Sequence, residues 1–181
     1  MASVSGLTVR TYCLPTRTER TRMRPSTLAK TVGAVIAIAT IGGLAGRPAE
    51  SDWYARLKKP RFQPPRQVFP IVWPVLYADI AAVSASTIDG LQDQKRSEKA
   101  RAYTAALAVN LILNGSWTWL FLSRHQLGAS AAVAAALTAS SADLTRRAVE
   151  ARSTSGAPLV LYPLWCAFAT ALSTRIWLLN R

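Results

Sequence analysis

Long stretches without a charged residue alternate along this chain with short clusters of basic residues. Three stretches, Ala102–Ser123, Gln126–Ala142 and Ser153–Thr174, contain no Asp, Glu, Lys or Arg. Each reaches the roughly 17 mostly apolar residues that a helix needs to cross the hydrocarbon core of a bilayer. Helices on the surface of a water-soluble protein carry a charged or polar face along every turn, and these stretches lack one. The pattern therefore predicts membrane-spanning helices.

Two further stretches complete the pattern. Thr31–Gly46 reaches membrane length when Leu28 and Ala29 are added, and Gln67–Ile88 is interrupted by Asp79 alone. We expect an all-α membrane protein, a five-helix bundle within one domain over 28–181, rather than a soluble bundle of Ala-rich helices. The expected spans are about 28–46, 67–89, 101–123, 127–147 and 157–179.

Most basic residues lie outside these spans or close to their ends. Residues 1–27 form a basic, Ser/Thr-rich segment that we expect to be a disordered tail, with Met23 as an alternative start of the chain. The formal net charge of +13 first points to nucleic acid, but DNA-binding modules are charge-rich throughout, and here the spans carry almost no charge. We expect contacts with membrane lipids and none with nucleic acid. Positive charge favours a cytoplasmic N-terminus for the full chain and gives no preference for a chain that begins at Met23.

Metal-binding and catalytic residues are scarce. The two cysteines, Cys13 and Cys166, have no metal-ligand spacing, and His125 is the single histidine. A zinc site and a nucleophile–histidine pair are therefore both improbable. We expect no metal, no catalytic residue and no bound cofactor.

Polar side chains inside the third span lie on one face of the helix. Asn110 and Asn114 are four residues apart, and Trp117 continues the same stripe. Two amides and an indole supply donors and acceptors in an apolar setting, where polar groups are costly and usually line a contact or cavity. The stripe is either a wall for a flat, mostly apolar ligand or a set of interhelical hydrogen bonds.

Aromatic residues in two other spans have the same helical spacing. Trp73 and Tyr77 are four residues apart in the second span, and Trp165 and Phe168 are three apart in the fifth. They lie too far inside the spans for an interfacial belt, so they either line a ligand site or pack in the core. The loop 47–66, which contains Trp53, is rich in proline, aromatic and basic residues, and we expect it to cover one end of the bundle.

These residues also form longer motifs in a fixed order. The loop contains Trp53-Tyr54-Ala55-Arg56-Leu57-Lys58-Lys59-Pro60, and the second span contains Val68-Phe69-Pro70-Ile71-Val72-Trp73. The third span contains Asn110-Leu111-Ile112-Leu113-Asn114-Gly115-Ser116-Trp117. The fifth span contains Tyr162-Pro163-Leu164-Trp165-Cys166-Ala167-Phe168-Ala169. From about residue 30 onwards the chain resembles the TspO/MBR family, whose animal members are called translocator protein or peripheral benzodiazepine receptor.

The resemblance implies five transmembrane helices around a ligand pocket, covered by the first loop and usually assembled as a homodimer. It implies ligands such as porphyrins (protoporphyrin IX or haem) and sterols. By position in the motifs it assigns the following ligand-binding residues: Trp53, Trp73, Asn110, Asn114, Trp117, Trp165 and Ala169. Tyr77 and Phe168 join them as neighbours on the same stripes. One departure is Thr174, near the place where the sterol-recognition pattern of animal members needs a Tyr, which argues against sterol binding through that pattern.

We therefore expect a multi-pass protein of a bacterial plasma membrane that binds tetrapyrroles as a sensor, scavenger or transporter. Two alternatives stay open. One is light- and oxygen-dependent degradation of the bound porphyrin, with Trp53 and Trp73 as redox-active indoles, and the other is transport of sterols or lipids.

Overall fold

The computed structural model describes residues 23–46, 52–151 and 156–181. These residues contain helices and no β-strand, so the all-α class is confirmed. In chain order the elements are α1 (Pro25–Gly46), α2 (Asp52–Arg56), α3 (Val68–Asp93), α4 (Ser97–Thr118), the π-helix η2 (Trp119–Ser123), α5 (Leu127–Ala151), the 3₁₀-helix η3 (Ala157–Val160) and α7 (Leu161–Leu179).

Within the described residues, five helical stretches are long and apolar enough to cross a membrane, as the sequence predicts. Their ends differ from the expected ones by a few residues. The first helix begins at Pro25, so Pro25–Thr27 are helical and do not belong to the expected tail, while residues 1–22 lie outside the described part of the chain. Helices α3 and α5 continue to Asp93 and Ala151, a few residues beyond the expected ends at 89 and 147.

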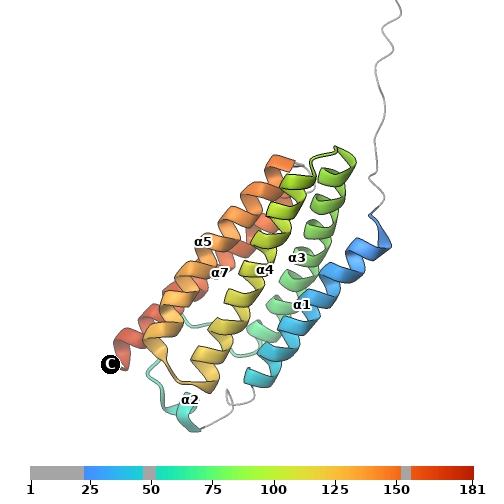
Figure 1. The fold of residues 1–181 in the computed structure, drawn as a ribbon. Coiled ribbons are helices and arrows are strands. Elements are labelled where there is room, and N and C mark those ends of the chain that lie inside the picture. The colour runs from blue at the N-terminus through green and yellow to red at the C-terminus, as the bar shows by residue number, and fades with distance from the viewer. Residues whose placement is uncertain (1–22, 47–51, 152–155) are drawn as a thin grey trace, which may run out of the picture.

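The long helices lie side by side in one bundle (Figure 1). Helix α5 packs along both α4 and α7, and α1 packs on α3 and α4, whereas α3 and α7 touch each other least among the packed long helices. The short helix α2 lies at the end of the bundle where the chain ends at Arg181. We call this end of the bundle the lid end. Helix α2 and the loop 57–67 together are called the lid.

Large apolar side chains lie on the surface of the bundle, and small polar ones lie inside it. Ile71 and Leu161 are 67% and 65% exposed, whereas Ser84 and Ser141 are fully buried. In water this distribution would be unfavourable, but lipid tails are as apolar as Leu, and small polar side chains inside a membrane bundle gain hydrogen bonds between helices. The distribution therefore agrees with a membrane environment around the five long helices.

The start of α1 is attached to the end of α3 by one buried carboxylate. Asp89, which is fully buried, accepts the backbone N–H of Arg24 at 2.6 Å and the hydroxyl of Thr27 at 2.7 Å. The Arg24 guanidinium bonds Gln92 and Asp93 one turn further along α3. Asp89 satisfies donors of the first turn of α1, which have no partner within the helix, so α1 is capped by a neighbouring helix.

Helix α1 crosses the bundle at an angle. Near its start Thr31 donates to the carbonyl of Ala81 in α3 at 3.1 Å, whereas near its end Ile38 and Gly42 reach Gly115 and Thr118 of α4. Small residues let membrane helices approach closely, and Gly42 and Gly115 serve this contact between α1 and α4.

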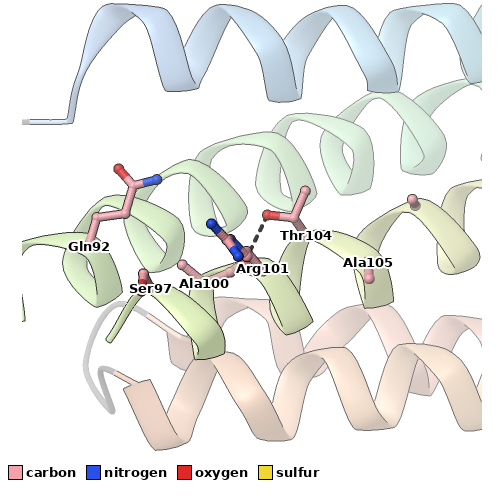
Figure 2. Close-up of a pocket in the computed structure, with 7 residues that line it drawn as sticks. Gln92, Ser97, Ala100, Arg101, Thr104 and Ala105 are labelled. Atoms are coloured by element: carbon pink, nitrogen blue, oxygen red, sulfur yellow. Dashed lines mark hydrogen bonds between the residues drawn. The ribbon is translucent and has the colours of Figure 1, made fainter. Parts of the chain in front are cut away.

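A groove of about 650 Å³ lies on the outer face of the bundle, at the end opposite the lid (Figure 2). It is lined by Gln92 of α3 and by Ser97, Ala100, Arg101, Thr104, Ala105 and Ala108 of α4. We call it the α4 groove.

Candidate ligand site

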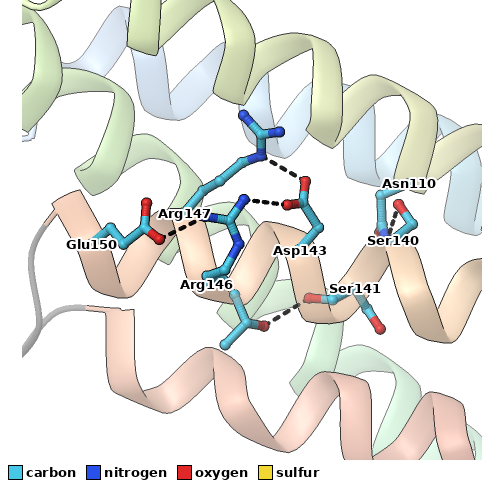
Figure 3. Close-up of polar contacts among 8 residues, drawn as sticks. Asn110, Ser140, Ser141, Asp143, Arg146, Arg147 and Glu150 are labelled. Carbon is cyan, nitrogen blue, oxygen red and sulfur yellow. Dashed lines mark hydrogen bonds and ion pairs between the residues drawn. The ribbon is translucent and has the colours of Figure 1, made fainter.

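A layer of buried amides and hydroxyls joins four helices at the centre of the bundle. Asn110 and Asn114 of α4 are at most 1% exposed. Tyr77 of α3 donates its hydroxyl to the Asn114 Oδ1 at 2.8 Å, and Tyr162 of α7 donates to the Asn110 Oδ1 at 2.8 Å. Asn110 Nδ2 in turn donates to Ser140 of α5 at 3.2 Å (Figure 3). Interhelical hydrogen bonds were one of the two alternatives for the polar stripe on this helix, and the two Asn side chains form them. We call this hydrogen-bonded layer of side chains the floor.

Between this floor and the lid lies a group of aromatic side chains from three helices. Phe69, Trp73 and Tyr77 follow one another at four-residue spacing on a single stripe of α3. Trp73 lies 6.4 Å from Trp117 of α4, and Phe69 lies 6.0 Å from Trp165 of α7, measured between ring centroids. The stripe on α3 therefore meets aromatic rings on both neighbouring helices. With the remaining rings in contact, the aromatic cluster consists of Phe69, Trp73, Tyr77, Trp117, Phe121, Trp165 and Phe168.

The end of α4 has an unusual backbone next to this cluster. Trp119–Ser123 form a single π-helical turn, a feature that is rare and often lies at functional sites. Phe121 in that turn is buried and stacks on Trp117, with ring centroids 5.9 Å apart. His125, two residues after the turn, has a positive φ of 55° and ends the helix. The turn thus directs Phe121 towards the lid.

The lid packs on the aromatic cluster through its own rings. Trp53 of α2 stacks on His125 at 3.8 Å and meets Phe121 edge-on at 6.3 Å. Phe62 of the loop lies 6.3 Å from Phe168 of α7. The lid therefore contacts the aromatic cluster through both Trp53 and Phe62.

One residue at the end of the chain holds the lid to the bundle. The Asn180 side chain exchanges two hydrogen bonds with the backbone of Lys58, from N–H to Oδ1 and from Nδ2 to the carbonyl, both at 2.9 Å. Its Nδ2 also donates to the carbonyl of Ile176 in α7 at 2.7 Å. A single amide thus connects the lid to the last turn of α7.

Two buried polar atoms have no hydrogen-bond partner among the described residues: Nε1 of Trp165 in α7 and Oε1 of Gln63 in the lid. Gln63 uses its other amide atom to donate to the hydroxyl of Tyr54 at 3.2 Å. Trp117 provides the contrast, since its indole N–H donates to Ser173 at 3.1 Å. A buried polar group without a partner is uncommon in proteins and needs an explanation, and a bound ligand with polar edges supplies one.

The lid is strongly basic. Within 52–66 the basic residues are Arg56, Lys58, Lys59, Arg61 and Arg66, against a single acid, Asp52. Lys59 and Arg66 lie over the ring of Tyr54, at 4.7 and 5.7 Å from its centroid. Cations over an aromatic face stabilise the loop and keep positive charge close to the aromatic cluster.

The charges at the opposite end of α5 are arranged differently. Asp143 bonds both Arg146 and Arg147, at 2.7 and 2.6 Å, and Arg146 also bonds Glu150 (Figure 3). These charges lie close to their partners and are largely neutralised. The Arg side chains at this end of α5 are thus paired with carboxylates, whereas the lid has five basic residues and one acid.

The structure brings most of the predicted site residues together. Trp73, Tyr77, Trp117, Trp165 and Phe168 lie in the aromatic cluster, Asn110 and Asn114 lie in the floor, and Trp53 lies in the lid. Ala169 is half-buried on α7, directly after Phe168. The sequence reading missed Gln63, Phe69 and Phe121. Phe69 was detectable because it precedes Trp73 by four residues, whereas Gln63 and Phe121 depend on the path of the loop and on the π-helical turn.

Comparison with known proteins shows to which family this chain belongs. The model of the TspO/MBR family matches residues 31–178. Protein CrtK of Rhodobacter capsulatus is 31% identical over 145 residues, which are 80% of this chain and 89% of CrtK. The tryptophan-rich sensory protein of Cereibacter sphaeroides is 32% identical over 78% of this chain and 84% of its own, and the translocator protein of Bos taurus is 34% identical over 76% and 83%. With its five membrane-length helices and its match over most of its length, the chain belongs to the TspO/MBR family of membrane proteins.

Proposed function

We propose that this protein binds a tetrapyrrole, with protoporphyrin IX or haem as the type, among the rings of the aromatic cluster and beneath the lid. The observation that carries the proposal is the convergence of seven aromatic side chains from α3, α4, η2 and α7, one of which, Trp165, has a buried N–H without a partner among the described residues. Large apolar rings with a few polar groups are typical of small-molecule sites.

The chemistry of a tetrapyrrole matches three properties of the site. Its flat π system stacks on indole and phenyl rings. Its polar edges can pair with the Trp165 N–H and the Gln63 carbonyl, which have no protein partner. Its propionates carry negative charge, and Arg56, Lys58 and Arg61 belong to the lid, which packs on the aromatic cluster.

Binding is the activity that the residues of this site support most directly. The residues of the site are indoles, phenols, phenyls and amides, which bind a π system. We therefore propose a role as a sensor, scavenger or carrier of tetrapyrroles, acting as a homodimer in the plasma membrane of a bacterium.

The direct test is a titration of the purified full chain with protoporphyrin IX in detergent, followed by tryptophan fluorescence. The wild type is compared with Trp73→Ala and Trp165→Ala, and with Trp119→Ala as the matched control, since Trp119 is 47% exposed on the outer face. We expect the two site variants to bind at least tenfold more weakly and the control to bind like the wild type. Equal affinity in all four proteins would show that the ligand binds elsewhere.

A further inference from the structure

The rings of the aromatic cluster lie too close together to hold a flat ligand between them. The ring centroid of Trp117 lies 5.9 Å from that of Phe121 and 6.4 Å from that of Trp73. The centroids of Phe69 and Trp165 are 6.0 Å apart. A flat π system that is stacked between two rings lies about 3.5 Å from each, so the two rings must be about 7 Å apart. A tetrapyrrole can therefore stack between any of these pairs only after a ring has moved.

Two rings of the cluster are held by hydrogen bonds between helices. The Tyr77 hydroxyl donates to Asn114 at 2.8 Å, and the Trp117 indole N–H donates to Ser173 at 3.1 Å. Moving either ring breaks such a bond in an apolar environment, which is costly. Phe121 carries no polar atom on its side chain, so packing alone holds its ring. Among the members of the cluster, Phe121 is therefore held least firmly by its side chain.

The backbone under Phe121 is also different from that of the other cluster residues, which lie in α3, α4 and α7. In the π-helical turn η2 the Arg124 N–H donates to the carbonyl of Trp119, five residues earlier, at 3.0 Å. In an α-helix the same N–H would donate to Leu120. An α-helix turns by about 100° per residue, so removal of the one extra residue in the turn rotates the side chains after it by about 100° relative to α4. A change of hydrogen-bond register therefore moves Phe121.

Phe121 is also the ring through which the lid reaches this part of the cluster. It is buried and meets both Trp53 and Tyr54 of α2 edge-on, each at 6.3 Å between ring centroids. Trp53 stacks in addition on His125, whose φ of 55° is uncommon for a residue other than glycine. A movement of the turn therefore changes ring contacts in the cluster and in the lid at the same time.

We propose that Phe121 is the gate of the tetrapyrrole site. In the closed state, which this structure shows, Phe121 stacks on Trp117 beneath the lid. When the ligand enters, η2 becomes α-helical, the Arg124 N–H transfers from the Trp119 carbonyl to that of Leu120, and the phenyl ring leaves Trp117. A phenyl ring that leaves the interior of a membrane bundle meets apolar lipid, so its displacement costs less than in a water-soluble protein. This inference rests on the proposed function, and it concerns how the ligand gains access to the site.

The alternative role of Phe121 is that of a fixed wall on which the ligand stacks. A wall contributes to affinity, so a smaller side chain would weaken binding. A gate opposes entry, so a smaller side chain speeds association and a larger one slows it. The two roles therefore predict opposite effects of the same substitution.

The test is stopped-flow association of protoporphyrin IX with the purified full chain in detergent, followed by tryptophan fluorescence. We expect Phe121→Leu to associate about fivefold faster than the wild type, because opening no longer breaks a stacked ring pair, and to bind no more weakly at equilibrium. Phe121→Trp should associate about fivefold more slowly, because a larger ring gains contact in the closed state. Phe168→Leu is the matched comparison, since Phe168 belongs to the same cluster but lies in the regular helix α7, and it should bind more weakly.

A second measurement needs no substitution and so does not depend on whether the variants fold. Hydrogen exchange of the wild type, with and without saturating protoporphyrin IX, reports on the backbone of η2. We expect exchange within 122–126 to slow by about tenfold in the complex, because regular α-helical bonds replace those of the π-helical turn. The segment 105–115 of α4 is the internal reference and should exchange at the same rate in both states.

The outcomes separate the gate from the function on which it rests. Weaker binding without faster association in Phe121→Leu, as in Phe168→Leu, would make Phe121 a wall and overturn the gate. Unchanged exchange within 122–126, while tryptophan quenching shows that the ligand is bound, would also overturn the gate and leave the proposed function standing. A wild type that binds no protoporphyrin IX would overturn both.

Discussion

Some polar atoms of the site have a hydrogen-bond partner within the described protein, and others do not. Trp117 and Trp165 are both half-buried indoles of the aromatic cluster, but Trp117 donates its N–H to Ser173, whereas Trp165 has no partner among the described residues. A hydrogen bond within the protein contributes to stability, and a donor left without a partner contributes to binding when a ligand satisfies it. The two indoles should therefore respond differently to the same change.

Trp165→Phe keeps an aromatic ring and removes the N–H without a partner. We expect protoporphyrin IX to bind about tenfold more weakly, because one buried hydrogen bond to the ligand is lost, and the melting temperature to stay within a few degrees of the wild type. Trp117→Phe is the matched variant, and it should lower the melting temperature because it leaves Ser173 without its donor. Fluorescence titration and thermal unfolding in the same detergent measure both effects. A clear loss of stability in Trp165→Phe would mean that its N–H has a partner within the protein.

The floor can be tested by a double-mutant cycle on its central pair. Asn110→Ala and Tyr162→Phe each remove the hydrogen bond between Tyr162 and Asn110 Oδ1, so we expect each to cost about 1–2 kcal/mol of unfolding free energy. The double variant should lose less than the sum, because the second change has no bond left to break. Reversible unfolding in mixed micelles gives these values, and strict additivity would argue against a shared bond.

The sequence alone was sufficient to predict the placement of those site residues whose position on a helix face follows from helical periodicity. Asn110, Asn114 and Trp117 lie on one face, as predicted, because the i, i+4, i+7 relation fixes them on any α-helix. Their hydrogen-bond partners were not predictable, since Tyr77, Tyr162 and Ser140 reach them only through the packing of other helices. The same reason explains why Gln63 was missed.

Among the elements, the lid depends most on a few contacts. Helix α2 has only five residues and no buried one, so it cannot be stable by itself. Its position comes from the stacking of Trp53 on His125 and from the clamp between Asn180 and Lys58. The prolines of the loop indicated that no long helix forms there, but the clamp joins residues 122 positions apart and has no local signal.

Asn180→Ala should loosen the lid without unfolding the bundle. It removes both bonds to the backbone of Lys58, so we expect faster hydrogen exchange in 53–63 and faster release of protoporphyrin IX, each by a factor of about ten. The neighbouring change Arg181→Ala is the control, because it leaves the clamp in place. Exchange in the lid at the wild-type rate would show that the clamp does not hold it.

The attachment of α1 provides a second test at this scale. Asp89→Ala leaves the Arg24 N–H and the Thr27 hydroxyl without their acceptor, and we expect a loss of about 1–2 kcal/mol in unfolding free energy. Asp93→Ala is the milder comparison, since it removes only an exposed ion pair with Arg24, and such pairs contribute little. If both variants unfold alike, the buried cap is not the main attachment of α1.

At the scale of the whole molecule, the uncharged stretches predicted the fold. Five membrane-length helices follow from length and composition alone, because the bilayer imposes both. Their order of packing does not follow from composition, since all lipid-facing surfaces are equally apolar. The positions of the basic residues relative to the site also follow only from the folded protein, in which the basic lid covers the aromatic cluster and Arg101 borders a groove on the outer face.

The central claim is that a flat, anionic π ligand binds in the aromatic cluster under this basic lid. The most direct measurement is the fluorescence titration of the purified wild type with protoporphyrin IX, alongside Trp73→Ala and the outer-face control Trp119→Ala. The account predicts saturable quenching with one ligand per chain in the wild type and control, and binding at least tenfold weaker in Trp73→Ala. Quenching that never saturates, or that saturates identically in all three proteins, would contradict it.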